Sequence, residues 1–157
     1  MTSIAFAGPR QVSGYSEAGI KRRMLEETKK LGATRIVMGC AINVDQWAAQ
    51  LALHIGVPFV AAVPFVGFSD KWTMSQKEKL QKLLDRAADV HVVCAPGFAE
   101  WKYHRRNAWM VDKSDVLIAV WDRAKELTTR KASGTGNCVR YAMKVGKPCV
   151  IIDPAAC

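Results

Sequence analysis

The sequence predicts an α/β fold in three layers, with a doubly wound, mainly parallel sheet covered by helices on both faces. Short apolar runs alternate along the chain with segments of helical periodicity, which is the pattern of successive strand–helix–strand units. The apolar runs are continuous rather than alternating, as expected for parallel strands buried on both faces. The chain has 157 residues, half of them hydrophobic, and no repeat or linker, so we expect a single domain, 1–157.

Glycines and prolines set the expected boundaries in the first half of the chain. The first apolar run ends at Gly8, and Gly32 follows the first helical segment as a C-terminal glycine does. Gly39 ends the second apolar run, Gly56 follows the second helix, and Pro64 ends the third strand. The expected elements are strand 4–7, helix 16–31, strand 35–38, helix 44–54, strand 59–63 and helix 75–87, whose leucines have helical spacing.

The second half repeats this alternation as strand 90–94, helix 102–113, strand 116–121, helix 136–145 and strand 149–152. The longest irregular stretches are 64–74 and 122–135, and each of them follows a strand. Both stretches should therefore lie at the carboxyl edge of the sheet, where folds of this class bind their ligands.

The charge balance points to an anionic partner. Lys and Arg number 23 against 14 Asp and Glu, which gives a net charge of +9. An excess of this size favours a nucleotide, a nucleic acid or an acidic surface as the partner, without choosing among them.

Cysteine usage and hydropathy indicate a reduced cytoplasmic compartment. The five cysteines form no CxxC pair, and no Cys/His cluster has the spacing of a metal site, so neither a metal nor a cofactor is expected. Cys94 and Cys149 lie in apolar runs and are expected to be core residues. We expect no signal peptide at residues 1–10, and no apolar segment approaches the roughly 20 residues of a membrane span.

Polar residues follow the first two strands. Gly8 allows close backbone approach, and Arg10 offers a planar guanidinium to a phosphate or carboxylate, although a tight turn with a surface arginine explains them equally well. Gly39 leads to a helix whose first turn contains Asp45. From the residues alone, we favour a structural explanation in which Asn43 caps this helix and Asp45 complements its dipole. The functional alternative is a ribose-binding or catalytic carboxylate.

Two later segments belong to the same edge. Small residues at 133–137 precede a helix, and free N–H groups at a helix N-terminus suit a phosphate, although such turns are also common without ligands. The segment matches neither a Walker motif nor GxGxxG. Arg106 and Asn107, expected at the start of the fourth helix, either face the same crevice or lie on a solvated helix face.

The following segments, taken together, match a known pattern in the right order along nearly the whole chain. They are Ala7-Gly8-Pro9-Arg10 (TGxR in the family), Gly39-Cys40-Ala41 with Val44-Asp45-Gln46-Trp47-Ala48-Ala49 (GGAxGVDxWAA), Pro64-Phe65, Lys71-Trp72, Arg106-Asn107 with Met110-Val111-Asp112 and Ser114-Asp115 (RNxxMVDxSD), and Ser133-Gly134-Thr135 (GGT). The chain thereby resembles the SLOG superfamily of Smf/DprA and LOG proteins, and in particular its YpsA-like branch.

This resemblance implies a Rossmann-like fold that binds a nucleotide or nucleotide-derived ligand at the carboxyl edge of the sheet. The residues implied in ligand binding are Gly8, Arg10, Gly39, Asp45, Arg106, Asn107, Gly134, Thr135 and Gly136. Four positions depart from the family motifs, because Ala7, Cys40, Asn43 and Ser133 replace a threonine and three glycines. A side chain in place of glycine narrows the backbone approach to a ligand, so the pocket is expected to differ in shape.

Three functions remain open. LOG enzymes, which cleave the N-glycosidic bond of nucleoside monophosphates, carry a glutamate in PGGxGTxxE, whereas 133–140 here has no carboxylate. We therefore expect a nucleotide binder or sensor with weak or absent hydrolase activity, for which Asp45 is the first candidate catalytic group. The second function is single-stranded nucleic acid binding of DprA type, supported by basic clusters and by Trp72, Trp101, Tyr103 and Trp109. The third is full LOG-type phosphoribohydrolase activity. A homo-oligomer is also expected, because tryptophan-rich loops suit subunit interfaces.

Overall fold

The computed structural model describes residues 1–157 and contains six strands in one sheet. The strands are β1 (Thr2–Ala7), β2 (Ala33–Met38), β3 (Phe59–Val63), β4 (Asp89–Val92), β5 (Val116–Val120) and β6 (Cys149–Ile152). Their order in the sheet is β4-β3-β2-β1-β5-β6, and every neighbouring pair is parallel. The predicted three-layer Rossmann-like α/β fold is therefore confirmed, and the mainly parallel sheet is in fact parallel throughout.

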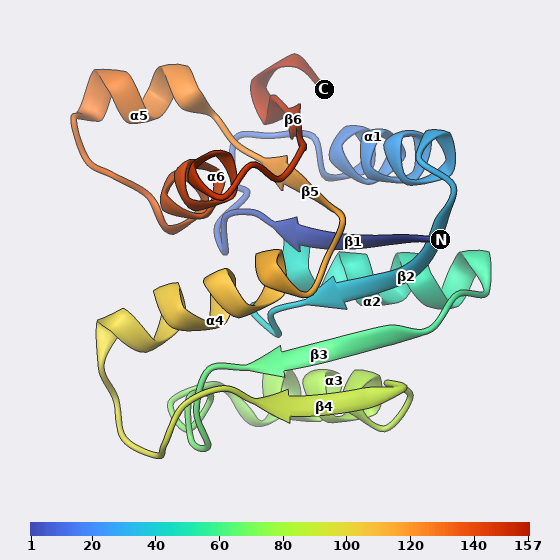
Figure 1. Ribbon diagram of the computed structural model, residues 1–157. Coiled ribbons are helices and arrows are strands. Elements are labelled where there is room, and N and C mark those ends of the chain that lie inside the picture. Colours follow the sequence, from blue (N-terminus) through green and yellow to red (C-terminus); the bar gives the residue numbers. More distant parts are fainter.

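Helices cover both faces of this sheet (Figure 1). They are α1 (Glu17–Lys30), α2 (Val44–Ile55), α3 (Met74–Leu84), α4 (Glu100–Asp112), α5 (Arg123–Thr129) and α6 (Gly134–Lys144), and a 3-10 turn at Pro154–Ala156 follows β6. The first three helices lie on one face, and α4 and α6 lie on the other. None of these helices is both long enough and apolar enough to cross a membrane.

Each central strand divides its side chains between two cores. In β1, Ile4 and Phe6 belong to the cluster beneath α1, α2 and α3, whereas Ala5 and Ala7 belong to the cluster beneath α4 and α6. All four residues are buried. A strand that buries both of its faces has no polar position to alternate, which is why the sequence showed continuous apolar runs.

Local signals explain most helix ends. The Ser16 hydroxyl caps α1 by accepting from the Gly19 N–H, and Thr73 forms a capping box with Gln76 at α3. Gly56 ends α2 in the left-handed conformation. Helix α4 begins at Glu100 rather than at residue 102, so Arg106 lies in the middle of that helix and not at its start.

Helix α5 was not expected, because the segment 122–135 was predicted to be irregular throughout. Asp122 caps this helix through a hydrogen bond from the Lys125 N–H, and none of its residues is buried. Its one large apolar side chain, Leu127, is 68% exposed. A helix without a buried stripe leaves no hydrophobic periodicity in the sequence, so the pattern gave no sign of it.

The prediction that Cys94 and Cys149 are core residues was wrong for Cys94, whereas Cys149 packs against the edge of the core beneath α4 and α6. Cys94 and Cys149 are only partly buried, because both lie near the ends of short edge strands. The buried cysteines are Cys40, which follows β2, and Cys138 in the second turn of α6. Burial raises the pKa of each of these two thiols to about 12, although the charge of Arg106 acts in the opposite direction. Both are therefore neutral thiols in the two cores.

Candidate functional site

A cavity of about 550 Å³ opens at the carboxyl edge of the sheet, between the segments that follow β1, β2, β3 and β5. Seven of the nine residues expected to bind a ligand line this cavity: Gly8, Arg10, Asp45, Arg106, Asn107, Gly134 and Thr135. The other two, Gly39 and Gly136, do not line it and lie against residues that do. The fold therefore brings together segments that are more than a hundred residues apart in the chain.

Gly8 is required by packing within the protein. A Cβ atom at this position would lie 2.5 Å from the Cγ1 atom of Val44, the first residue of α2. Val44 is fully buried and cannot move away. The glycine thus lets the end of β1 approach the N-terminus of α2, and this approach forms one wall of the cavity.

Gly39, at the end of β2, lies between two buried charges. A Cβ atom there would stand 2.9 Å from the Asp45 Oδ2 atom and 3.0 Å from the Arg106 Cζ atom. Arg106 donates a hydrogen bond through Nη1 to the Gly39 carbonyl and a second through Nε to the Asn107 Oδ1 atom, at 2.8 Å. Asp45 and Arg106 are 6% and 7% exposed. The three residues form a compact unit at the base of the cavity.

Burial raises the pKa of the Asp45 carboxyl group above its ordinary value. The charge of Arg106, a hydrogen bond of 3.0 Å from the Ala41 N–H to Oδ2, and the charge of Arg10 oppose this effect without cancelling it. The other oxygen, Oδ1, has no hydrogen-bond partner within the protein. A desolvated carboxyl group with one free oxygen at a cavity wall is suited to bind a hydroxyl group or to donate a proton.

The turn between β2 and α2 has an uncommon backbone. Cys40 and Asn43 have φ angles of 72° and 71°, in the region that favours glycine. These are two of the positions where the resembling family has glycine, so the backbone geometry accounts for the family pattern. The Asn43 side chain makes no capping hydrogen bond, contrary to the structural explanation favoured from the sequence. Its Nδ2 atom donates to the Arg10 carbonyl and ties the segments after β1 and β2 together.

The first turn of α6 forms another wall of the cavity. The Ser133 hydroxyl caps the helix by accepting from the Gly136 N–H at 2.9 Å. Thr135 is buried, and its hydroxyl makes no hydrogen bond within the protein. Sequence reasoning found these residues but missed Glu126, a residue of α5 that also lines the cavity. Glu126 belongs to none of the family motifs, so no sequence signal pointed to it.

The Glu126 carboxylate has three hydrogen-bond donors. They are the Trp121 Nε1 atom at 2.8 Å, the Ser133 Oγ atom at 2.7 Å and the Arg140 Nη1 atom at 2.8 Å. Burial on its own would raise the pKa of this group, but the three hydrogen bonds outweigh burial and lower the pKa to about 2. A Cβ atom at Gly136 would overlap the carboxylate, so that glycine makes room for Glu126.

Aromatic side chains border the opposite end of the cavity. Phe68 and Trp72 pack edge to face, with 5.4 Å between ring centroids, and Phe98 and Tyr103 lie 6.3 Å apart. Of the four aromatic residues expected to stack on bases, Trp72 and Tyr103 line this cavity. Trp101 and Trp109 instead line a separate hollow beside Cys94, on the side of α4 that faces away from it.

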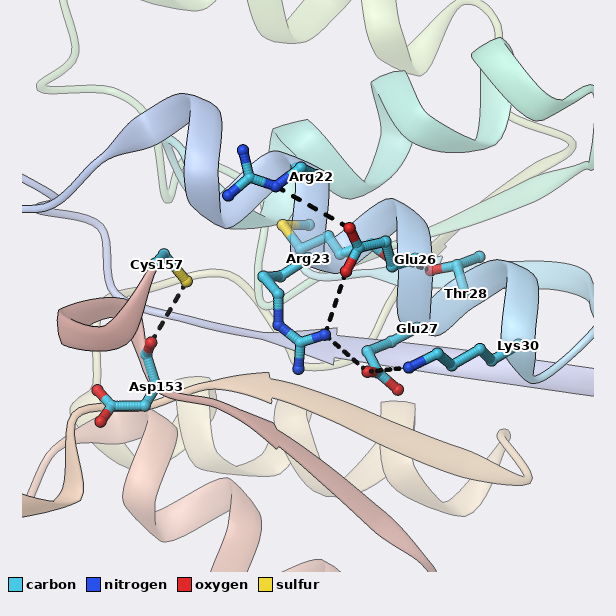
Figure 2. A network of polar contacts seen from close by, with 9 residues as sticks. Arg22, Arg23, Glu26, Glu27, Thr28, Lys30, Asp153 and Cys157 are labelled. Carbon is cyan, nitrogen blue, oxygen red and sulfur yellow. Dashed lines mark hydrogen bonds and ion pairs between the residues drawn. The ribbon is translucent and has the colours of Figure 1, made fainter.

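The basic cluster of α1 is largely paired within its own helix (Figure 2). Arg23 Nη1 lies 2.9 Å from Glu27 Oε1 and 3.3 Å from Glu26 Oε2, and Lys30 also contacts Glu27. Lys21 pairs with Glu17 at 3.0 Å. Helix α1 has five basic and three acidic side chains, so these contacts leave two of its positive charges unbalanced, and Lys29 has no ion-pair partner. Lys79, Lys82 and Arg86, on and just after α3, are exposed and have no ion-pair partner.

The cavity holds no arrangement typical of a metal centre. No group of three or more His, Cys, Asp or Glu side chains lies close enough to hold a metal ion. The charged groups that line it include two arginines, Arg10 and Arg106, and two lysines of the segment after β5, Lys125 and Lys131. They also include carboxyl groups, among which Asp45 has a raised pKa and Glu126 a lowered pKa.

The fold and this edge define a Rossmann-like domain of the SLOG class. The model of the YpsA family, described as the YspA SLOG family, matches residues 12–156, and the chain belongs to this family. Among curated proteins, the SPbeta prophage-derived protein YoqJ of Bacillus subtilis is 29% identical over an alignment of 126 residues that covers 70% of this chain and 70% of YoqJ. The protein YpsA of the same organism is 25% identical over 78% of this chain and 71% of its own.

Solved structures share the fold. DNA processing protein A of Helicobacter pylori, whose single-stranded DNA binding mode has been described, superposes with a TM-score of 0.67 at 23% identity. The match covers 97% of this chain and spans about two thirds (65%) of that protein's length. At this identity the likeness concerns the fold.

Proposed function

We propose that the protein binds a nucleotide or nucleotide-derived ligand in the cavity at the carboxyl edge, as a binder or sensor. The observation that supports this proposal is that two kinds of polar group line the same cavity. The buried unit of Gly39, Asp45 and Arg106 forms the base, and the first turn of α6 contributes N–H groups and the unpartnered Thr135 hydroxyl. Helix N-termini bind phosphate, and a carboxyl group with a free oxygen binds ribose hydroxyls.

The same geometry supports weak hydrolase activity at most. Cleavage of an N-glycosidic bond needs a proton for the departing base, and Asp45, with its raised pKa, is the group suited to donate it. Glu126 lies beside the first turn of α6, but its three donors keep it ionised and engaged. A full LOG-type enzyme would need a free carboxylate in that place.

A panel of nucleoside monophosphates and dinucleotides tests both statements. Binding is measured by calorimetry, and release of free base is followed by chromatography, for the wild type and Asp45→Asn. We expect binding with little release. Robust release of free base that Asp45→Asn abolishes would show an enzyme instead. If no compound of the panel binds, the proposal is wrong.

Single-stranded nucleic acid is the second candidate ligand, because aromatic side chains line one end of the cavity and basic residues of α3 are unpaired. Phe98, which is 78% exposed, offers a surface for base stacking. Labelled oligonucleotides at increasing salt test it, with Phe98→Ala and a paired variant Lys79→Gln/Lys82→Gln. Binding that is absent even at low salt would exclude this candidate, since phosphate attraction is strongest there.

A further inference from the structure

The chain places one of its own carboxylates where an anion would bind. Glu126 accepts hydrogen bonds from Ser133, the N-cap of α6, and from Arg140, two turns further along the same helix. A hydroxyl, a guanidinium and the positive end of a helix are the groups that bind phosphate in proteins. The Glu126 side chain is only 13% exposed, so it fills this place rather than pointing into solvent.

The neighbouring donors have no partner in the protein. Thr135 is 9% exposed and lines the cavity, yet its hydroxyl makes no hydrogen bond within the protein. The N–H groups of Gly134 and Thr135 belong to the first turn, where no intrahelical acceptor exists. The Thr135 residue is nine-tenths buried, but its hydroxyl oxygen is open to the cavity, and this unpartnered hydroxyl is an observation separate from the helix terminus. It indicates that the set of donors is larger than Glu126 alone uses.

The segment that carries Glu126 is weakly attached to the domain. We call residues 122–133 the strap; it includes α5 and contributes a wall of the cavity. No residue of α5 is buried, and Arg130 after it has a left-handed φ of 54°. Besides the Glu126 contacts, the strap is held near its start by a hydrogen bond of 2.8 Å from the Tyr15 hydroxyl to Asp122 and by Lys125, whose Nζ atom lies 5.8 Å from the centre of the Tyr15 ring. Segments with few buried contacts open at low free-energy cost.

Arg140 does not line the cavity, and its half-exposed side chain reaches Glu126 from outside the lining. We propose that Ser133 and Thr135, with Arg140 beside them, form a phosphate site whose internal occupant is Glu126, and that a ligand phosphate displaces this carboxylate and releases the strap. The inference rests on the proposed nucleotide-binding function and adds its regulation. Two anions cannot share these donors, because like charges repel strongly where solvent is largely excluded. The strap is therefore closed in the free protein and open when the ligand phosphate is bound.

Calorimetry with AMP and with inorganic pyrophosphate tests the competition. Glu126→Gln should bind both probes roughly tenfold more tightly, because it removes the competing charge and keeps the side-chain shape. Arg140→Gln should bind them more weakly, because it removes a phosphate donor. Glu78→Gln, on exposed α3, removes the same charge elsewhere and should bind like the wild type. Opposite effects from the two partners of one ion pair cannot come from a shared folding defect.

Limited trypsin digestion reports the strap directly, because Arg130 and Lys131 lie within it and are exposed. Pyrophosphate should speed cleavage after these residues in the wild type, and Glu126→Gln should be cleaved rapidly without it. Weaker binding by Glu126→Gln would mean that Glu126 contacts the ligand and would overturn the inference. Unchanged affinity with unchanged cleavage would also overturn it, while the proposed function would stand. If no variant binds either probe, both fail together.

Discussion

The guanidinium of Arg106, in the middle of α4, donates a hydrogen bond to the carbonyl of Gly39 at the end of β2. This contact joins helix α4 to the carboxyl end of β2 at the base of the cavity. Asp45 approaches the same glycine from α2, so the two charges meet where only a residue without a side chain fits.

Gly39→Ala should destabilise the protein by roughly 1–3 kcal/mol, because the new methyl group would press against Asp45 and Arg106 in a packed interior. Urea unfolding measures the change. Gly134→Ala is the matched control, since nothing lies within 4 Å of the position its Cβ would take. Equal stability of the Gly39 variant and the wild type would show that the buried unit is looser than described.

Asp45→Asn should raise stability at neutral pH. The folded-state pKa of Asp45 is raised, so between the unfolded value near 3.8 and the folded value the native state binds more protons than the unfolded state. The contribution of this group to the unfolding free energy therefore falls as pH rises through that window, by up to about 1.4 kcal/mol per pH unit. Above the folded-state pKa the contribution no longer changes with pH. The difference in unfolding free energy between variant and wild type should grow across this window.

The control for this experiment is Arg106→Gln, which removes the charge that opposes the effect of burial. Without that charge the folded-state pKa of Asp45 should rise further, so the pH window should extend to higher pH. If the difference in unfolding free energy between Asp45→Asn and the wild type does not change with pH, the pKa of Asp45 is not raised in the folded protein.

Asn43→Ala should be less stable than Asn43→Gly by about 1 kcal/mol, because both lose the hydrogen bond to the Arg10 carbonyl but only alanine opposes the φ of 71°. Thermal unfolding of the two variants side by side gives the comparison. If alanine proved equal to glycine, the backbone of this turn would have to differ from that described.

Lys102→Met should destabilise the segment after β4. The Lys102 Nζ atom donates to the carbonyls of Ala95, Pro96 and Gly97, at 2.7, 3.2 and 2.6 Å, and the residue is buried. Loss of these charge-assisted hydrogen bonds should cost about 2–3 kcal/mol, measured by urea unfolding. Lys79→Met removes a charge from an exposed site and should change stability by less than about 0.5 kcal/mol.

The hydrophobic pattern was sufficient for the layers of the fold and for the edge of the sheet at which the candidate cavity lies. Continuous apolar runs marked buried parallel strands, and glycine or proline after each run placed Gly8, Arg10, Asp45 and Gly134 at one edge. These features are local, because burial of a strand and the end of a helix depend on residues a few positions apart. They can be read in sequence order.

Only the tertiary structure decided which side chains meet. It assigned Gly8 to the packing of Val44 and Gly136 to the space that Glu126 occupies. It also paired four of the five basic residues of α1 with glutamates of the same helix. Glu126 itself lies on a helix that buries nothing and so leaves no periodic signal, and its three donors come from separate segments. Contacts between distant segments depend on how helices are placed over the sheet, and no spacing along the chain records that placement.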